Sequence, residues 1–194
     1  MRITALVKSH DHVCCRYRIT AFRDHLESLG HALEVRPWST GWFLQQLFPS
    51  FAPRFEVLVI QRKLFPAWQL ARLRRRVRWL VYDFDDSIFL NSSNHPTRMD
   101  CPKRLRQFRN MVQAADLVVA GNAFLSESAC QYTDRAKVVR IPTCVDADRY
   151  PLAAHSPGSG LVRLAWIGSS STLRGLERQR RMLRASDDSF GFGR

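Results

Sequence analysis

The sequence lacks the features of a secreted or membrane-spanning protein. It holds 5 cysteines in 194 residues and contains no C-x-x-C pair, which argues against a disulfide framework and against a zinc ribbon. No apolar run approaches the roughly 18 to 20 residues that a membrane-spanning helix needs. The first apolar stretch, "RITALV", is too short and is followed too soon by polar residues to be a signal peptide. These absences favour a soluble cytoplasmic protein with reduced thiols.

Acidic residues are scarce, and three of them stand together. Against 30 Lys and Arg there are 17 Asp and Glu, which gives a formal net charge of +13. Such a charge attracts phosphate esters, nucleic acid or an acidic membrane surface without choosing among them, so peripheral membrane contact is compatible with it. Yet Asp83, Asp85 and Asp86 lie close together in the apolar run "VRWLVYDFDDSIF". Because like charges repel and unpaired burial is costly, we expect a partner from outside the strand to meet them.

Short apolar runs alternate with helical patterns along residues 1–142. Strands are predicted at 2–7, 31–38, 56–62, from 77, at 116–121 and at 137–142, and helices at 17–30, 66–76, 102–115 and from about 122. In the helix at 102–115, Leu105, Phe108, Val112 and Ala115 share one face. This alternation predicts the α/β class, with a mostly parallel sheet covered by helices on both faces. Ligands of such sheets bind beyond the carboxyl ends of the strands, where the three aspartates lie.

The segment "DFDDS" is compatible with other interpretations. It resembles the D-x-D-x-[ST] pattern of haloacid-dehalogenase-like phosphatases, in which Asp83 would be the nucleophile and Asp85 the general acid. It also resembles a D-x-D motif that holds Mg²⁺ or Mn²⁺ together with a nucleotide diphosphate. A purely structural alternative is that Asp85 or Asp86 caps the following turn and pairs with an arginine of 72–76.

The composition changes after residue 150. Residues 151–160 are rich in Pro, Gly and Ser and read as a linker, and 161–194 supply one strand and one helix of a second α/β domain. In "AWIGSSSTLRGLE", the helix is expected to begin near Thr172, and its first turn contains Arg174 and no acid. Its free amides would suit an external diphosphate, and Gly175 would let that ligand approach closely. An ordinary strand-to-helix connection remains the alternative.

Four segments taken in order resemble glycosyltransferase family 4. They are "VYDFDDSIF", "AADLVVAGNAFL", "KVVRIPTCVDADRY" and "LAWIGSSSTLRGL". The family consists of retaining enzymes of the GT-B fold that use nucleotide sugars. The resemblance covers residues 1 to about 180, and Val145, Asp146 and Tyr150 match its hinge segment. It implies a Rossmann-like acceptor-side domain at 1–150 and, at 161–194, the start of a truncated donor-binding domain.

The resemblance also implies which residues bind each substrate. The acceptor, which is a sugar, a lipid or another molecule, would lie against Arg16, Tyr17, Arg18, Asp83, Asp85 and Asp86. The donor diphosphate would lie against Gly168, Ser169, Ser170, Ser171, Thr172, Arg174 and Gly175. No cofactor beyond the nucleotide-sugar donor and no metal is implied, and no catalytic residue can be assigned. The chain ends before the family's paired donor-site glutamates, so we expect weak or no activity from it alone.

Two further sequence patterns are compatible with binding of nucleic acid or of zinc. Residues 72–78, "RLRRRVR", hold five arginines and no acid, as in nucleic-acid-binding surfaces. However, Leu73 and Val77 continue a helical stripe, which favours a solvated helix face. The stretch "SHDHVCC" offers His10, His12, Cys14 and Cys15 as zinc ligands. No second ligand cluster matches it in the sequence, so a plain loop with free thiols is favoured.

Overall fold

The computed structural model describes residues 1–39, 54–91 and 100–152, with the isolated positions 167, 168, 173, 177 and 179. The chain divides into two compact units, Met1–Val145 and Asp146–Arg194. In the second unit, the description includes one short 3-10 turn, η3 (Ala147–Arg149), in which the Asp146 side chain accepts a hydrogen bond from the backbone of Asp148. The sheet and its helices belong to the first unit.

The first unit is built on a six-stranded sheet with the order β2-β1-β3-β4-β5-β6. The strands are β1 (Arg2–Val7), β2 (Ala32–Pro37), β3 (Phe55–Gln61), β4 (Val77–Phe84), β5 (Leu117–Ala120) and β6 (Val138–Arg140). Every pairing between neighbouring strands is parallel. The predicted α/β class with a parallel sheet is therefore confirmed. The strand order changes direction between β1 and β3, which is the switch point where ligands of such sheets bind.

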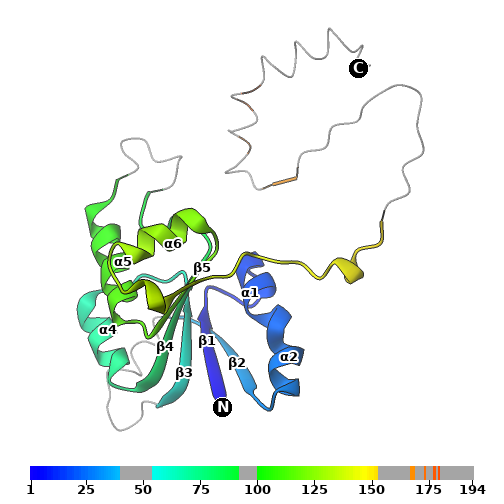
Figure 1. The fold of residues 1–194 in the computed structure, drawn as a ribbon, viewed down its shortest axis with the longest axis horizontal. Coiled ribbons are helices and arrows are strands. Elements are labelled where there is room, and N and C mark those ends of the chain that lie inside the picture. The colour runs from blue at the N-terminus through cyan, green and yellow to red at the C-terminus, as the bar shows by residue number, and fades with distance from the viewer. Residues whose placement is uncertain are drawn as a thin grey trace. The chain divides into compact units, whose positions relative to one another are not determined.

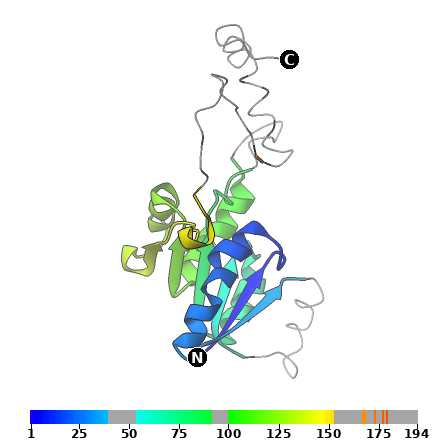
Figure 2. The ribbon, with the colours of Figure 1, turned by 90° about the vertical axis from the view of Figure 1, so that its right-hand side faces the viewer.

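Helices cover both faces of this sheet (Figures 1 and 2). The helices α1 (Val13–Arg18) and α2 (Arg23–Ser28) lie on one face with the 3-10 turn η1 (Thr20–Phe22), and α4 (Ala67–Arg74), α5 (Pro102–Ala114) and α6 (Ala123–Cys130) lie on the other. A further 3-10 turn, η2 (Arg135–Lys137), precedes β6. The crossover from β1 to β2 thus lies on one face of the sheet, and the three crossovers that lead from β3 to β6 lie on the other.

Two apolar clusters follow from the alternation of side chains along the strands. On β1, Leu6 belongs to the larger cluster, which α4, α5 and α6 cover. Its neighbours Ala5 and Val7 belong to a smaller cluster beneath α1, together with Cys15 and Ile19. Burial on both faces explains why the strands read as nearly continuous apolar runs in the sequence.

The apolar spacing along α5 predicts only part of its buried face correctly. Pro102 occupies its first turn, and Phe108 and Val112 are buried against the sheet as the spacing predicts. Leu105, predicted to lie on the same buried face, is 39% exposed instead. Periodicity identifies the apolar side of a helix, but it does not tell how far along the helix that side is covered.

The stretch predicted as one helix at 17–30 is divided. The helix α1 begins earlier, at Val13, and ends where Ile19 leaves helical geometry with φ −124° and ψ −66°. At this break Arg18 and Ile19 are both buried, Ile19 in the smaller cluster. The expected end of the stretch is found at Gly30, whose φ of +76° favours glycine.

Tyr82 presents an unusual feature of the larger cluster. It is fully buried, burial raises the pKa of its phenol well above the ordinary value, and among the described residues its hydroxyl has no hydrogen-bond partner. We expect Tyr82→Phe to leave the free energy of unfolding unchanged or to raise it by about 1 kcal/mol, because the substitution removes an unsatisfied buried polar group. Urea unfolding would measure this, and a clear loss of stability would contradict it.

Candidate functional site

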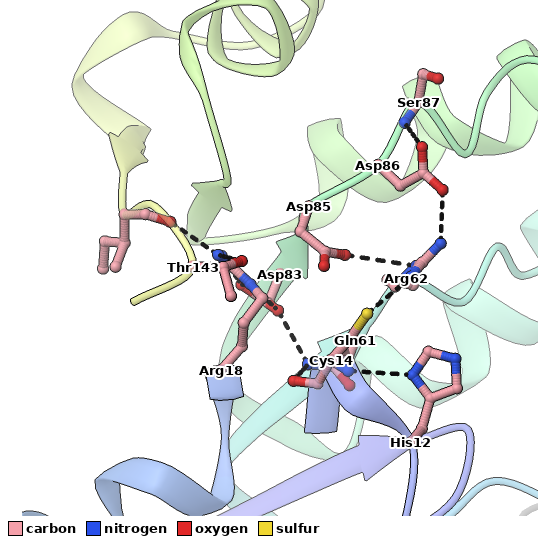
Figure 3. A network of polar contacts seen from close by, with 11 residues as sticks. His12, Cys14, Arg18, Gln61, Arg62, Asp83, Asp85, Asp86, Ser87 and Thr143 are labelled. Carbon is pink, nitrogen blue, oxygen red and sulfur yellow. Dashed lines mark hydrogen bonds and ion pairs between the residues drawn. The ribbon is translucent and has the colours of Figure 1, made fainter. Parts of the chain in front are cut away.

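Polar side chains from four separate segments meet at the carboxyl edge of the sheet beside the switch point (Figure 3). The segments are the loop and helix that follow β1, the end of β3, the end of β4 and the residues after β6. The network they form consists of His12, Cys14, Arg18, Gln61, Arg62, Asp83, Asp85, Asp86, Ser87, Ile141 and Thr143.

Arg18 and Asp83 form a buried ion pair at the centre of this network. Arg18 Nε lies 3.1 and 3.2 Å from the two carboxylate oxygens of Asp83, and Nη2 also donates to Oδ1. The two side chains are 3% and 6% exposed. Burial raises the pKa of Asp83 above its ordinary value, while hydrogen bonds from Arg18 and Gln61 oppose that shift. The cation that the sequence required for Asp83 is therefore Arg18, 65 residues earlier in the chain.

The same guanidinium extends to the end of β6. Arg18 Nη1 donates to the carbonyl oxygen of Ile141 at 2.9 Å and to the hydroxyl of Thr143 at 3.2 Å. On the other side, Gln61 Nε2 donates to Asp83 at 3.3 Å and to the carbonyl oxygen of Cys14 at 3.1 Å. Arg18 thus ties α1 to β4 and to the segment after β6, and Asp83 has its hydrogen bonds satisfied by the protein.

Asp85 and Asp86 form ion pairs with Arg62, the residue after β3. Arg62 Nη2 donates to Asp86 at 2.8 Å, and Nε lies 3.5 Å from Asp85 Oδ1. Asp86 also accepts from the backbone N–H of the next residue, Ser87, at 2.8 Å. The Asp85 Oδ1 atom is buried and receives no hydrogen bond from the described part of the chain.

The arginine that pairs with these acids does not come from 72–76. Within that run, Arg74 donates to Asp116 at 2.8 Å and to the carbonyl oxygen of Val77 at 2.7 Å. Arg72 lies against the ring of Trp68, 5.4 Å from its centroid. Arg74 therefore holds α4 to the start of β4 and to the residue before β5, whereas Arg72 contacts α4 itself. The pairing with an arginine that the structural alternative for "DFDDS" expected is present, but the arginine is Arg62.

Arg62 sits in a tight turn. Its φ is +58°, and Lys63 N donates to the carbonyl oxygen of Gln61 at 2.7 Å. A non-glycine residue in this region costs about 1–3 kcal/mol and persists only where surrounding contacts hold it. Here the backbone N–H of Arg62 donates to the carbonyl oxygen of Asp83 at 2.8 Å. The turn brings the side chains of two consecutive basic residues to the edge of the sheet.

His12 and Cys14 belong to the start of α1. His12 caps the helix, because its Nδ1 accepts from the backbone N–H of Cys14 at 3.3 Å. Burial first, and then the charges of Lys8 and Arg62, lower the pKa of His12. Burial raises the pKa of the Cys14 thiol, whose sulfur accepts from Arg62 Nη1 at 2.8 Å. Within the described ranges no three potential ligands are grouped to hold a metal, and the cysteines are free thiols.

Of the other residues predicted for the acceptor side, Arg16 is exposed on α1 and its guanidinium lies 5.6 Å from the ring centroid of Tyr17. Of the residues predicted for the donor side, Gly168 is described, and it is exposed. The remaining positions fall outside the described residues; these are Ser169, Ser170, Ser171, Thr172, Arg174 and Gly175.

Sequence reasoning missed Gln61, Arg62 and Thr143. A signal for the first two was present, because "EVLVIQR" reads as a buried strand that ends in two polar residues at the same edge as the aspartates. No comparable signal marks Thr143. It follows a short strand, and only the folded structure brings it to Arg18, which is distant in sequence.

A cavity of about 340 Å³ lies on the α1 and α2 face of the sheet. Its walls are mostly apolar and include Phe22, Leu26, Val59 and Val81, and Arg18 and Asp83 also line it. The buried ion pair therefore separates this apolar cavity from the polar edge of the sheet.

Gly121 fixes the position of Asp85. Its backbone N–H donates to the carbonyl oxygen of Phe84 at 2.9 Å, and a Cβ placed on it would lie 2.8 Å from Asp85 Cα. We expect Gly121→Ala to destabilise the protein by about 1–3 kcal/mol, because backbone rather than a flexible side chain must move. Chemical denaturation would measure the loss, and an alanine variant as stable as the wild type would contradict the close approach.

Comparison with known proteins adds no family assignment. No protein-family model matches the chain, and no curated protein matches it. Among the described helices, none is both long and apolar enough to cross a membrane.

Proposed function

We propose that the chain is a glycosyltransferase-like protein that takes part in transferring a sugar from a nucleotide-sugar donor to an acceptor, with the first unit on the acceptor side. The observation that carries this proposal is the meeting of polar groups from the segment after β1 and from the ends of β3 and β4 at the carboxyl edge of a parallel sheet, beside the switch point. The resemblance of four ordered segments to glycosyltransferase family 4 supports it.

The geometry assigns unequal roles to the predicted residues. Arg18 and Asp83 bond to each other, and Arg18 also donates to the carbonyl oxygen of Ile141, so we assign them to positioning α1 and β4 rather than to touching substrate. Asp86, whose side chain is 62% exposed, is the aspartate best placed to accept hydrogen bonds from acceptor hydroxyls. Donor recognition rests on the resemblance of the segment from Gly168 to Gly175.

The two alternatives are less well supported. A phosphatase that uses Asp83 as its nucleophile needs a free carboxylate oxygen in contact with substrate, whereas Asp83 is 4% exposed and bonded to Arg18 and Gln61. A nucleic-acid surface on 72–78 needs several free arginines on one face. There Arg74 is engaged with Asp116, and Leu73 and Val77 are buried.

Thermal unfolding of the full chain with a panel of nucleotide sugars tests the proposal. A ligand at about 100 times its dissociation constant should stabilise the chain by about 2.7 kcal/mol, and Arg174→Ala should reduce that gain. Stabilisation by single-stranded DNA or RNA, lost steeply as salt is raised, would favour the nucleic-acid alternative instead. Hydrolysis of p-nitrophenyl phosphate would favour the phosphatase. No stabilisation by any nucleotide sugar would overturn the proposal.

A further inference from the structure

A small pocket with basic walls lies beside the aspartates, at the carboxyl edge of β1 and β3. It has a volume of about 210 Å³. We call it the basic pocket and define it by six of its lining residues: Lys8, His12, Trp38, Arg62, Lys63 and Arg104. It is smaller than the roughly 300–1,000 Å³ that enclose a whole drug-sized ligand, so it suits one chemical group of a ligand.

Four of these side chains are cations, and the described carboxylates do not neutralise them all. Among the described carboxylates, Asp85 and Asp86 form ion pairs with a cation of the pocket, and both pair with Arg62. Lys8, Lys63 and Arg104 have no ion pair with the described residues. An excess of positive charge of this kind attracts a group with more than one negative charge.

Two of the cations are held in place before any ligand arrives. Lys63 Nζ lies 3.3 Å above the ring centroid of Trp38, and Arg104 Nε donates to the carbonyl oxygen of Ile88 at 2.7 Å. Lys63 also follows Arg62 in the turn with φ +58°. Residues held in such unfavourable backbone geometry cluster at ligand sites, where the cost is offset by surrounding contacts.

His12 adds a neutral donor. Because its Nδ1 accepts from the backbone of Cys14, the neutral ring carries its proton on Nε2, which can donate to an anion. Burial first, and then the charges of Lys8 and Arg62, lower the pKa of His12, which favours this neutral ring.

We propose that the basic pocket binds the phosphate group of a phosphate ester. A phosphate monoester carries nearly two negative charges and three acceptor oxygens, which match an excess of cations and several N–H donors better than the single charge of a carboxylate. The proposal concerns binding and does not depend on sugar transfer. The phosphate can belong to a small soluble molecule or to a lipid headgroup.

Calorimetric titration of the full chain with glucose 6-phosphate at physiological salt tests the soluble source, with glucose and glucuronate as neutral and carboxylate probes. We expect saturable binding of glucose 6-phosphate alone. Lys8→Met and Lys63→Met should each weaken it at least about 10-fold, because each removes a charged hydrogen-bond donor. Lys137→Met removes the same charge from an exposed position outside the pocket and should leave the affinity unchanged.

Flotation with phosphatidylcholine vesicles, with or without phosphatidic acid, tests the lipid source. Binding to the acidic vesicles alone, lost in both pocket variants and kept in Lys137→Met, supports the proposal with a lipid ligand. The proposal is overturned if neither phosphate probe binds, if glucuronate binds as tightly as glucose 6-phosphate, or if Lys137→Met weakens binding as much as the pocket variants. Thermal unfolding of each variant checks its fold, and two separate pocket variants keep the test decisive if one is unstable.

Discussion

Replacing Arg18 by methionine is expected to lower the free energy of unfolding by about 3–5 kcal/mol, the largest effect of any single polar substitution in the network. Methionine fills much of the same space but leaves Asp83 buried without its cation. It also leaves the carbonyl oxygen of Ile141 without its donor from Arg18. Urea unfolding at neutral pH would measure the loss.

The pH dependence of that loss identifies its cause. Burial already raises the pKa of Asp83 above 3.8, and removing Arg18 takes away the strongest opposing contact, so the pKa in the folded state rises further. A folded-state pKa above the unfolded value favours folding at low pH, and that contribution is lost as the pH rises through the folded-state pKa. The gap between the variant and the wild type should therefore be smallest near pH 4 and widen toward neutrality.

Two further variants complete this experiment. Arg18→Met with Asp83→Asn should recover part of the stability at neutral pH and flatten the pH dependence, because no buried charge remains. Arg135→Met breaks an ion pair with Glu127 whose side chains are 69% and 63% exposed, and it should change stability little. Equal losses for Arg18→Met and Arg135→Met would contradict a special role for the buried pair.

Phe108→Ala is expected to cost about 3–5 kcal/mol of stability. Phe108 is fully buried on α5, and its ring centroid lies 4.7 Å from that of Phe89 and 5.2 Å from that of Phe84. Truncation removes these contacts and leaves a cavity between α5 and β4. Guanidinium unfolding of the variant would measure the effect.

Leu105→Ala is the matched control for this prediction. Leu105 lies one turn earlier on the same helix and is 39% exposed. Its truncation should cost less than about 1 kcal/mol, since little of the surface it covers is withdrawn from water. The burial pattern along α5 would be contradicted if the two truncations were equally costly.

Most of the sheet could be predicted from sequence because its strands are buried on both faces. Runs such as "RITALV" and "EVLVIQ" are apolar throughout, and the expected strands agree with β1 and β3 to within a residue. The start of α1 was missed because its cap is His12 rather than Ser, Thr, Asp or Asn. Local sequence patterns recognise the common caps and fail at this rarer one.

The candidate site was predictable only in part. That Asp83 needs a cation follows from its place at the end of a buried strand. Which cation it takes does not, because Arg18 is distant in sequence and is one of 30 basic residues. The role of Arg62 could not be predicted either. Its backbone has a positive φ, which arginine normally avoids, so the sequence gives no sign of this turn.

The parallel order of the strands has a consequence for how the first unit forms. Each pairing joins segments separated by a crossover, and none of the six described strands can begin the sheet as a hairpin with its neighbour. The strand β1 meets β3 only after some fifty intervening residues exist, as the Ile3 to Val57 register shows. Folding is therefore expected to be slow for a chain of this size, and during synthesis β1 lacks its β3 partner until Gln61 has left the ribosome.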